Sequence, residues 1–303
     1  MDQATPLRKM VKLESQNRLR QKRLDAKSTV VTANTPRVIA ITSGKGGVGK
    51  TNVVGNLAIA CQKLGKKVLI FDADLGLANI DIIYGLQPKY NIEDIVKGTK
   101  ELSEVIVEGP EGVAVIPASS GVQELVHLTE GQKINLLDEF DSLNDTFDIL
   151  LIDTSAGISA NVLYFNLAAA ERIVVVTPEP TSITDAYALM KVMHHQHGTK
   201  NFLLLPNMVA DEREAKAVYE NLSSVTARFM GGISIEYAGF IPYDRNLPHA
   251  VSRRTPVICS HPDGPAGAGF KTLANHLIKQ RERQPVDGSI KFFWKRLMDV
   301  SFG

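Results

Sequence analysis

A glycine-rich stretch between a predicted strand and a predicted helix constrains the fold of this chain more than any other feature. Residues 43–51 read Ser-Gly-Lys-Gly-Gly-Val-Gly-Lys-Thr and fit the pattern G-x-x-x-x-G-K-[ST]. Residues 37–42 are short, apolar and β-branched, as in a buried strand, and residues 52–64 carry apolar side chains at helical spacing. Strand, loop and helix therefore occur in the order of a phosphate-binding loop. The alternative is a glycine-rich turn without a ligand.

The residue types in this loop suit nucleotide phosphates and Mg²⁺. Backbone N–H groups of a glycine-rich loop converge on phosphate oxygens, and the N-terminus of the following helix adds positive potential. Lys50 is expected to reach the β- and γ-phosphates of ATP, and Thr51 is expected to bind Mg²⁺. The predicted phosphate-binding residues are Gly44, Lys45, Gly46, Gly47, Val48, Gly49, Lys50 and Thr51.

Acidic residues follow two further predicted strands. Residues 67–71 lead into Asp72 and Asp74, and residues 147–152 lead into Asp153. Ligands bind at the C-terminal ends of the strands in open α/β sheets, so we expect these acids near the loop. Asp153 has the position of the acid that holds Mg²⁺ in phosphate-loop enzymes, and Asp72 is expected to support the metal shell. The alternative for Asp72 and Asp74 is that they only cap the following turn.

Predicted strands and helices alternate through most of the chain, which has 303 residues. This alternation predicts an α/β fold with a mostly parallel central sheet flanked by helices. We predict one ATPase domain over residues 35–284, preceded by a basic tail over residues 1–34 and followed by a separate helix within residues 285–303. Cysteines outside any motif and the lack of an apolar N-terminal segment predict a cytoplasmic protein.

The C-terminal segment is predicted to form an amphipathic helix over residues 289–298. Its apolar face would consist of Ile290, Phe293, Trp294 and Leu297, which we predict to contact a membrane. Phe292 is off that face, while Lys291, Lys295 and Arg296 would attract anionic lipid. A basic amphipathic helix at a chain terminus is typical of a membrane-surface anchor. The alternative is a helix that packs on its own domain.

The second lysine of the loop, Lys45, makes it resemble the deviant phosphate loop K-G-G-V-G-K-T of the MinD/ParA class. The resemblance implies that Lys45 contacts the phosphates of a partner subunit, so that hydrolysis depends on dimerisation. Residues 72–79 resemble the D-x-D-x-G-x-x-N of switch I in that class, which implies that Asp74 orients the attacking water. Residues 154–157 resemble switch II, in which Gly157 would let the loop approach the γ-phosphate.

The same resemblance assigns roles to residues further along the chain. Glu179 and Asp185 match residues that face the subunit interface and the neighbouring nucleotide, although a helix that simply starts near Thr181 is compatible with both. Asn207 matches an asparagine that hydrogen-bonds the adenine. The I-P-x-D segment, whose backbone lies against the adenine in that class, corresponds to Ile241, Pro242, Tyr243 and Asp244.

The first residues resemble a narrower family. Residues 2–8 match D-Q-A-x-x-L-R, which opens the FlhG (FleN/YlxH) family of MinD-like regulators of flagellar number. The matching positions are Asp2, Gln3, Ala4, Leu7 and Arg8. In that family the motif is a helical activator that docks on FlhF, a GTPase of the signal-recognition-particle type.

The family resemblance implies an ATP-dependent homodimer that controls the number and placement of flagella. It also implies peripheral association with the anionic inner face of the cell membrane and stimulation of the FlhF GTPase. Flagellar switch-complex proteins or a flagellar transcription activator are the further expected partners, and no specific nucleic acid is expected.

The residues alone are also compatible with two other functions. A ParA-type DNA-segregation ATPase would bind DNA non-specifically through a basic face, to which Arg253 and Arg254 could contribute. The terminal apolar helix has no purpose in that alternative. The second is an interaction protein with a degenerate, non-hydrolysing site, against which Asp74, Asp153 and the two loop lysines argue.

Overall fold

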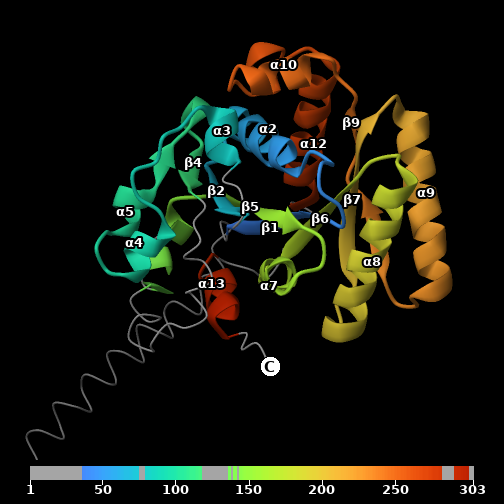
Figure 1. Cartoon of the computed structure of the whole chain (residues 1–303), viewed down its shortest axis with the longest axis horizontal. Helices are drawn as coiled ribbons and strands as arrows, with labels where there is room; N and C mark the ends of the chain where they lie inside the picture. Colours follow the sequence, from blue (N-terminus) through green and yellow to red (C-terminus); the bar gives the residue numbers. More distant parts are fainter. Residues whose placement is uncertain are drawn as a thin grey trace, which may run out of the picture. The chain divides into compact units, whose positions relative to one another are not determined.

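A mostly parallel β-sheet forms the centre of the computed structural model, which describes residues 36–74, 79–117, 136–137, 139–141, 143–281 and 290–299. The strand order is β3-β4-β2-β5-β1-β6-β7-β8, with β9 beside β7 (Figure 1). Only the β3–β4 pair is antiparallel among the described strands. The strands are β1 (Arg37–Ser43), β2 (Val68–Ala73), β3 (Val107–Glu108), β4 (Ala114–Ile116), β5 (Ile149–Ala156), β6 (Glu171–Val176), β7 (Asn201–Val209), β8 (Ser234–Tyr237) and β9 (Ile241–Pro242). The predicted fold class is confirmed.

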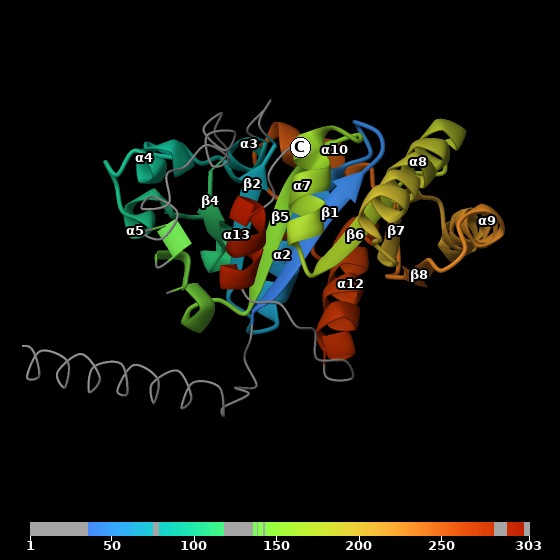
Figure 2. The ribbon, with the colours of Figure 1, turned by 90° about the horizontal axis from the view of Figure 1, so that it is seen from below.

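Helices cover both faces of this sheet (Figures 1 and 2). In Figure 1, α2 and α12 lie above the sheet, and α7, α8 and α13 lie below it. The helices are α2 (Lys50–Lys63), α3 (Ile80–Tyr84), α4 (Ile92–Val96), α5 (Leu102–Val105), α7 (Ala160–Ala168), α8 (Pro180–His197), α9 (Glu212–Phe229), α10 (Asn246–Ser252), α11 (Val257–Ser260), α12 (Pro265–Arg281) and α13 (Ile290–Asp299).

The apolar strands explain why both faces need cover. Successive side chains of a strand point to opposite faces, so Ile39 and Ile41 of β1 join the cluster under α2 and α12. Val38 and Ala40 join the cluster on the opposite face of the sheet, which α7 and α13 cover. A parallel sheet with continuous apolar strands is stable only when helices bury both of its faces.

Local signals set the ends of the long helices. α8 begins at Pro180, which suits a first helical position, and ends before Gly198, whose φ of 69° is left-handed. α9 follows Asp211, whose carboxylate accepts the Glu214 N–H at 2.9 Å. These signals lie within a few residues of the helix ends, so the sequence alone predicts them.

Two segments are only partly regular. The chain around residues 234–242 forms two short strands, β8 and β9, with Gly239 between them at a φ of 112°. Residues 136–137 and 139–141 are helical, while residues 118–135, 138 and 142 lie outside the described part of the chain.

The C-terminal helix forms as predicted, but its apolar face lies against the domain. The four residues of that face, Ile290, Phe293, Trp294 and Leu297, are each at most 1% exposed. Trp294 stacks on Phe140, with ring centroids 3.7 Å apart, and also contacts Phe71 of β2. In this state α13 is therefore part of the apolar core. Within the described part of the chain, no helix has both the length and the apolar character needed to cross a bilayer.

Candidate nucleotide site

The phosphate loop joins β1 to α2 with a backbone that only glycine accommodates at several points. Gly49 has a φ of 86°, and a Cβ there would lie 2.7 Å from Asn207 Nδ2. At Gly44 a Cβ would lie 2.1 Å from backbone atoms of Asp185 in α8. The glycines thus allow the loop to pack tightly against β7 and α8.

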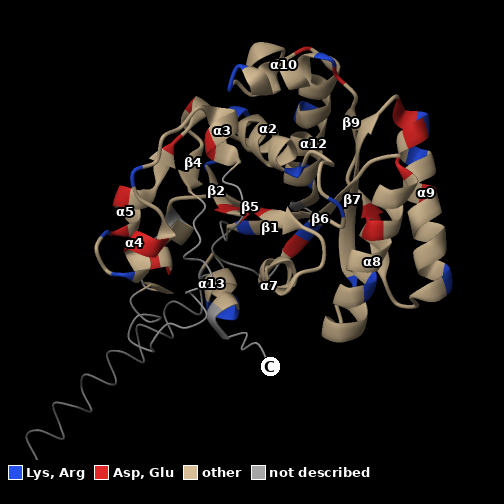
Figure 3. Ribbon diagram, in the orientation of Figure 1, with Lys and Arg blue, Asp and Glu red and all other residues tan. Residues whose placement is uncertain are grey.

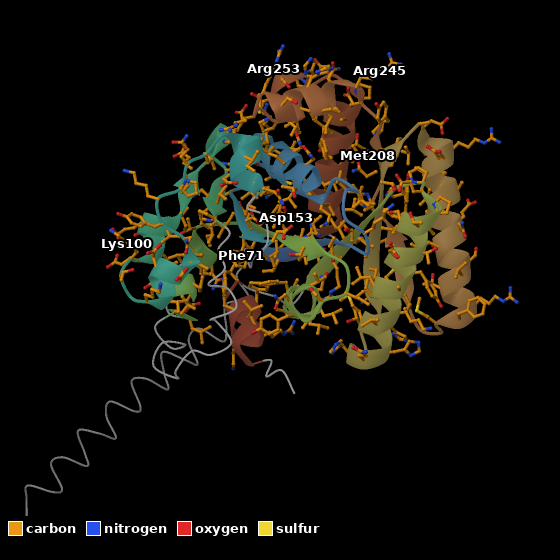
Figure 4. All side chains as sticks on the ribbon, in the orientation of Figure 1. Phe71, Lys100, Asp153, Met208, Arg245 and Arg253 are labelled. Atoms are coloured by element: carbon orange, nitrogen blue, oxygen red, sulfur yellow. The ribbon has the colours of Figure 1, made fainter. Side chains whose placement is uncertain are left out.

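The acidic residues predicted from the strand ends meet beside this loop. Asp72 of β2 and Asp153 of β5 are register partners in neighbouring parallel strands, and each is 1% exposed. Figure 4 places Asp153 at the centre of the sheet. Lys50 is also buried, and burial lowers its pKa, while Asp153 and Asp74 oppose this effect. Cationic and anionic groups therefore share one dry edge of the sheet.

Asp153 has the environment of a metal-binding carboxylate. Burial raises its pKa to about 8, the charge of Asp72 adds to this, and the nearby Thr51 hydroxyl acts in the opposite direction. Neither carboxylate oxygen makes a hydrogen bond of ordinary length to a described residue. Buried oxygens without partners are costly unless a cation binds them, and Mg²⁺ prefers oxygen ligands. Thr51 and Asp153 therefore fit Mg²⁺, which would stabilise negative charge on phosphate oxygens when bound.

Asp72 acts in the structure mainly as a cap for the switch I segment. Its carboxylate accepts the N–H groups of Asp74 at 3.1 Å, Asn79 at 3.2 Å and Ile80 at 3.3 Å. Burial raises its pKa to about 6, and these N–H donors oppose the rise. The capping alternative thus describes Asp72 well, and its role in the metal shell stays a prediction.

Asp74 links the two predicted switch segments. Ser155 donates its hydroxyl to Asp74 Oδ1 at 2.7 Å, and the Asn79 amide lies 3.5 Å from Asp74 Oδ2. Gly157, at a φ of 94°, donates its N–H to Ser43 O at 2.9 Å. We did not predict the role of Ser155 from the sequence, although its position two residues after Asp153 was a usable signal. The geometry supports an Asp74 whose orientation depends on switch II.

Lys45 is held by the beginning of α8. Its Nζ donates to Glu179 Oε2 at 2.7 Å and to Thr181 Oγ1 at 2.9 Å. The Lys45 and Glu179 side chains are 37% and 64% exposed. The structure thus brings together two residues that the sequence assigned to a subunit interface. It adds Thr181, to which the sequence analysis assigned no role at the interface.

The residues assigned to adenine also support the protein itself. Asn207 donates from Nδ2 to Val48 O at 2.7 Å, so its amide holds the phosphate loop. The Asp244 carboxylate accepts N–H groups from Asn246 and Ala266. Tyr243 is exposed and, with Glu179, lines a hollow of about 450 Å³ at this edge. Contact of Asn207 and residues 241–244 with adenine stays a prediction.

The remaining predicted site residues lie elsewhere. Residues 2–8, which carry the activator motif, lie outside the described residues. The predicted membrane-facing residues of α13 are buried in the apolar cluster below the sheet, away from the phosphate loop. The described part of the chain contains no group of three or more His, Cys, Asp or Glu residues able to hold a metal. A cation at Asp153 would therefore depend on hydroxyl, water or phosphate ligands as well.

The parallel sheet, the phosphate loop with a second lysine and the acids at the strand ends define a P-loop ATPase of the MinD/ParA class. The AAA domain family model matches residues 36–204. The chain is 43% identical over 262 residues to the "Antiactivator FleN" of Pseudomonas aeruginosa, covering 86% of this chain and 93% of that protein. It is 35% identical to the "Flagellum site-determining protein YlxH" of Helicobacter pylori, covering 86% of this chain and 90% of the relative.

A solved structure agrees with these sequence relationships. The septum site-determining protein MinD of Pyrococcus horikoshii, complexed with Mg-ADP, is 25% identical to this chain. It superimposes with a TM-score of 0.64, covering 81% of this chain and 97% of that structure. The chain belongs to the FleN/YlxH family of MinD-like ATPases.

Proposed function

We propose that this protein is an ATP-switched dimeric regulator of the number and placement of flagella. One observation carries the proposal: a site suited to ATP and Mg²⁺ occurs in a chain that is 43% identical, over 86% of its length, to an antiactivator of the FleN type. The second relative is a flagellum site-determining protein, which supports the same process. Control of flagella requires a protein that changes partners, and nucleotide hydrolysis supplies such a switch.

Dimerisation depends on Lys45 in this proposal. The lysine is half-exposed and bound to Glu179 and Thr181 by contacts that a second subunit can replace. In the closed dimer, the Lys45 ammonium stabilises charge on the phosphates of the opposite site, as an arginine finger does. Asp74, held by Ser155, orients the water that attacks the γ-phosphate. Hydrolysis would then open the dimer.

Membrane association is the second part of the proposal, and it requires α13 to leave its docked position. Its apolar face is fully used against the domain, so the docked helix has none of these side chains available for lipid. Basic residues lie on its outer surface (Figure 3), where Lys295 and Arg296 are exposed. Burial lowers the pKa of Arg172 to about 10, and the charge of Arg296 adds to this. The Arg172 guanidinium therefore stays protonated at neutral pH, and its repulsion with the Arg296 guanidinium favours release.

Two released helices on one ATP-bound dimer act as a bivalent membrane ligand. A single short amphipathic helix gives weak, reversible attachment, and linking two can raise avidity by roughly 10²–10⁴. Membrane binding therefore follows the nucleotide although α13 touches no nucleotide. The protein would act in the cytoplasm and at the inner face of the cell membrane.

The partner proposals rest on the resemblance alone. Asp2, Gln3, Ala4, Leu7 and Arg8 would stimulate GTP hydrolysis by an FlhF-type GTPase. The dimer surface would bind flagellar switch-complex proteins or a flagellar transcription activator. Residues 1–34 precede the first strand of the sheet, so this activity should be separable from ATP hydrolysis.

One observation favours the DNA-segregation alternative. Arg245, Arg253 and Arg254 beside α10 are exposed, and none of them forms an ion pair within the described ranges. Arg245 and Arg253 point away from the protein (Figure 4). Such a surface can bind phosphate backbones non-specifically. Retention of a DNA duplex that falls steeply with salt and is lost in R253E/R254E would favour this alternative.

Complementation tests the proposed function directly. Cells that lack the gene would be supplied with the wild-type protein or with the Asp74→Ala variant, and flagella per cell would be counted by electron microscopy. The wild-type protein should restore the number and position of flagella, whereas the variant should not. A normal count and position in cells that lack the gene would refute the proposal.

A further inference from the structure

Helix α7 connects the nucleotide edge of the sheet to the docked helix α13. It begins at Ala160, three residues after Gly157 of switch II. Its buried Tyr164 and Phe165 belong to the same apolar cluster as Phe293 and Trp294 of α13. The two helices lie side by side in Figures 1 and 2. A displacement of switch II therefore has a direct structural route to α13.

Two hydrogen bonds tie this region to the end of β1. Gly157 N–H donates to Ser43 O at 2.9 Å, and Asn166 Nδ2 in α7 donates to Thr42 Oγ1 at 3.0 Å. Thr42 and Ser43 are the last two residues of β1, immediately before Gly44 of the phosphate loop. Gly157 lies at the beginning of the segment from switch II to α7, and Asn166 lies near its end. Both positions of this segment are therefore attached to β1, the strand that carries the phosphate loop.

Asn166 is an unexpected residue for its surroundings. It is fully buried among apolar side chains, and its Nδ2 also donates to Val162 O at 2.7 Å. Its Oδ1 is buried and has no hydrogen-bond partner within the described residues. A buried amide with an unsatisfied oxygen costs free energy that leucine would not. Leucine would lack both bonds, but the bond to Val162 is internal to α7, so the bond to Thr42 is the one that connects α7 to β1.

The C-terminal end of α7 is held as well. Arg172 Nε in β6 donates to Asn166 O at 2.9 Å, and its guanidinium also donates to Ala169 O. At the other end, Thr154 of switch II donates its hydroxyl to Ile41 O at 2.9 Å within the sheet. Closer to α7, the Gly157–Ser43 bond and the Ser155–Asp74 bond hold the chain. Both of these bonds involve segments that the γ-phosphate is expected to reach. One end of α7 can therefore respond to the nucleotide while the other stays fixed.

We infer that Asn166 is a positioning residue that makes α7 a lever between switch II and α13. The Asn166–Thr42 bond acts as the pivot near the fixed end, so displacement of switch II turns α7 and disturbs the surface on which Trp294 rests. Without the pivot, α7 would slide along β1 and α13 would stay docked. The inference rests on the proposed nucleotide control of α13, and it names the residue that transmits it.

The test compares Asn166→Leu and Thr42→Val in the full chain. Trp294 is the only tryptophan, so fluorescence excited selectively at tryptophan reports on the surroundings of α13. We expect the difference in emission between ADP and a non-hydrolysable ATP analogue to be lost in N166L and reduced in T42V. The double variant T42V/N166L removes both polar partners with little change of shape and should lose no more than N166L. If a single variant folds poorly because one polar group is left without its partner, the double variant, which has neither group, still provides the test.

Asn56→Leu is the matched control. Asn56 in α2 is equally buried and likewise donates from Nδ2 to the carbonyl four residues earlier, that of Asn52, but it lies on the opposite face of the sheet. The Asn56 Oδ1 also accepts the Ile258 N–H at 3.0 Å, so N56L should lose at least as much stability as N166L and still keep the emission difference. A full difference in both N166L and T42V would overturn the inference alone. No difference in the wild-type protein would overturn the proposed nucleotide control and the inference with it.

Discussion

Replacing Phe140 with alanine should free α13 from the domain. Phe140 is fully buried, and its ring stacks on the Trp294 indole at 3.7 Å with an interplanar angle of 13°. Of the two domain rings that contact Trp294, Phe140 is the closer, since the Phe71 ring centroid lies 5.0 Å away. The substitution leaves every residue of α13 unchanged, so the released helix keeps its full apolar face for lipid.

The expected loss is large relative to the stability of the docked state. A buried Phe→Ala change costs roughly 3–5 kcal/mol, of which an aromatic pair contributes roughly 0.5–1.5 kcal/mol. Helices as short as α13 are marginal in water, so docking must supply its stability. Two features oppose docking: the buried Trp294 Nε1 has no hydrogen-bond partner among the described residues, and Arg172 faces the like charge of Arg296. A loss of about 3 kcal/mol would shift the docking equilibrium about 100-fold.

Fluorescence and liposome sedimentation measure the outcome. In the ADP-bound wild-type protein, Trp294 should emit at short wavelength and resist acrylamide quenching. In F140A its emission should shift to longer wavelength, and acrylamide should quench it. F140A should also sediment with anionic liposomes in ADP, whereas the wild-type protein should need ATP. Phe292→Ala is the control, because Phe292 is 59% exposed and exposed positions change stability by only about 0.5 kcal/mol.

One result would refute the reasoning. If F140A is folded by circular dichroism, keeps the wild-type emission and stays in the supernatant with ADP, Phe140 does not hold α13. A second variant separates release from lipid binding. Phe293→Glu should also undock α13, which Trp294 still reports, but it should not sediment in either nucleotide because it places a charge on the lipid-facing side.

The remaining predictions concern the nucleotide site and the basic tail. Asp74→Ala should bind ATP, form a stable dimer and hydrolyse ATP roughly 10²–10⁴-fold more slowly, because the water is no longer oriented; a wild-type rate of phosphate release would exclude the assignment. Lys50→Ala should lose nucleotide binding by calorimetry, whereas Lys45→Ala should keep part of it and lose ATP-dependent dimerisation by size-exclusion chromatography, and an equal loss of binding in both would contradict their separate roles. Deletion of residues 1–34 should leave ATP hydrolysis intact and abolish stimulation of an FlhF-type GTPase, and stimulation by the truncated protein would disprove the role of the tail.

The sequence by itself was sufficient for features that depend on neighbouring residues. The phosphate loop is one continuous segment, so its glycines, Lys50 and Thr51 could be assigned before any contact was known. The same holds for Asp72 and Asp153, which lie in the C-terminal halves of β2 and β5, because the carboxyl ends of parallel strands form one edge. The period of α13 also predicted which of its side chains share one apolar face, although we expected that face to contact a membrane.

Only the tertiary structure decided what these groups contact. Lys45 and Glu179 are separated by 134 positions, and no local pattern indicates that they meet. No local sequence pattern distinguishes Asn166 from other polar residues, because its bond depends on β1, which places Thr42 within hydrogen-bond distance. The apolar face of α13 suits a bilayer and a protein core equally, because the hydrophobic effect depends on the area removed from water and not on what covers it. Phe140 and Phe71 decide that the domain covers it in this state.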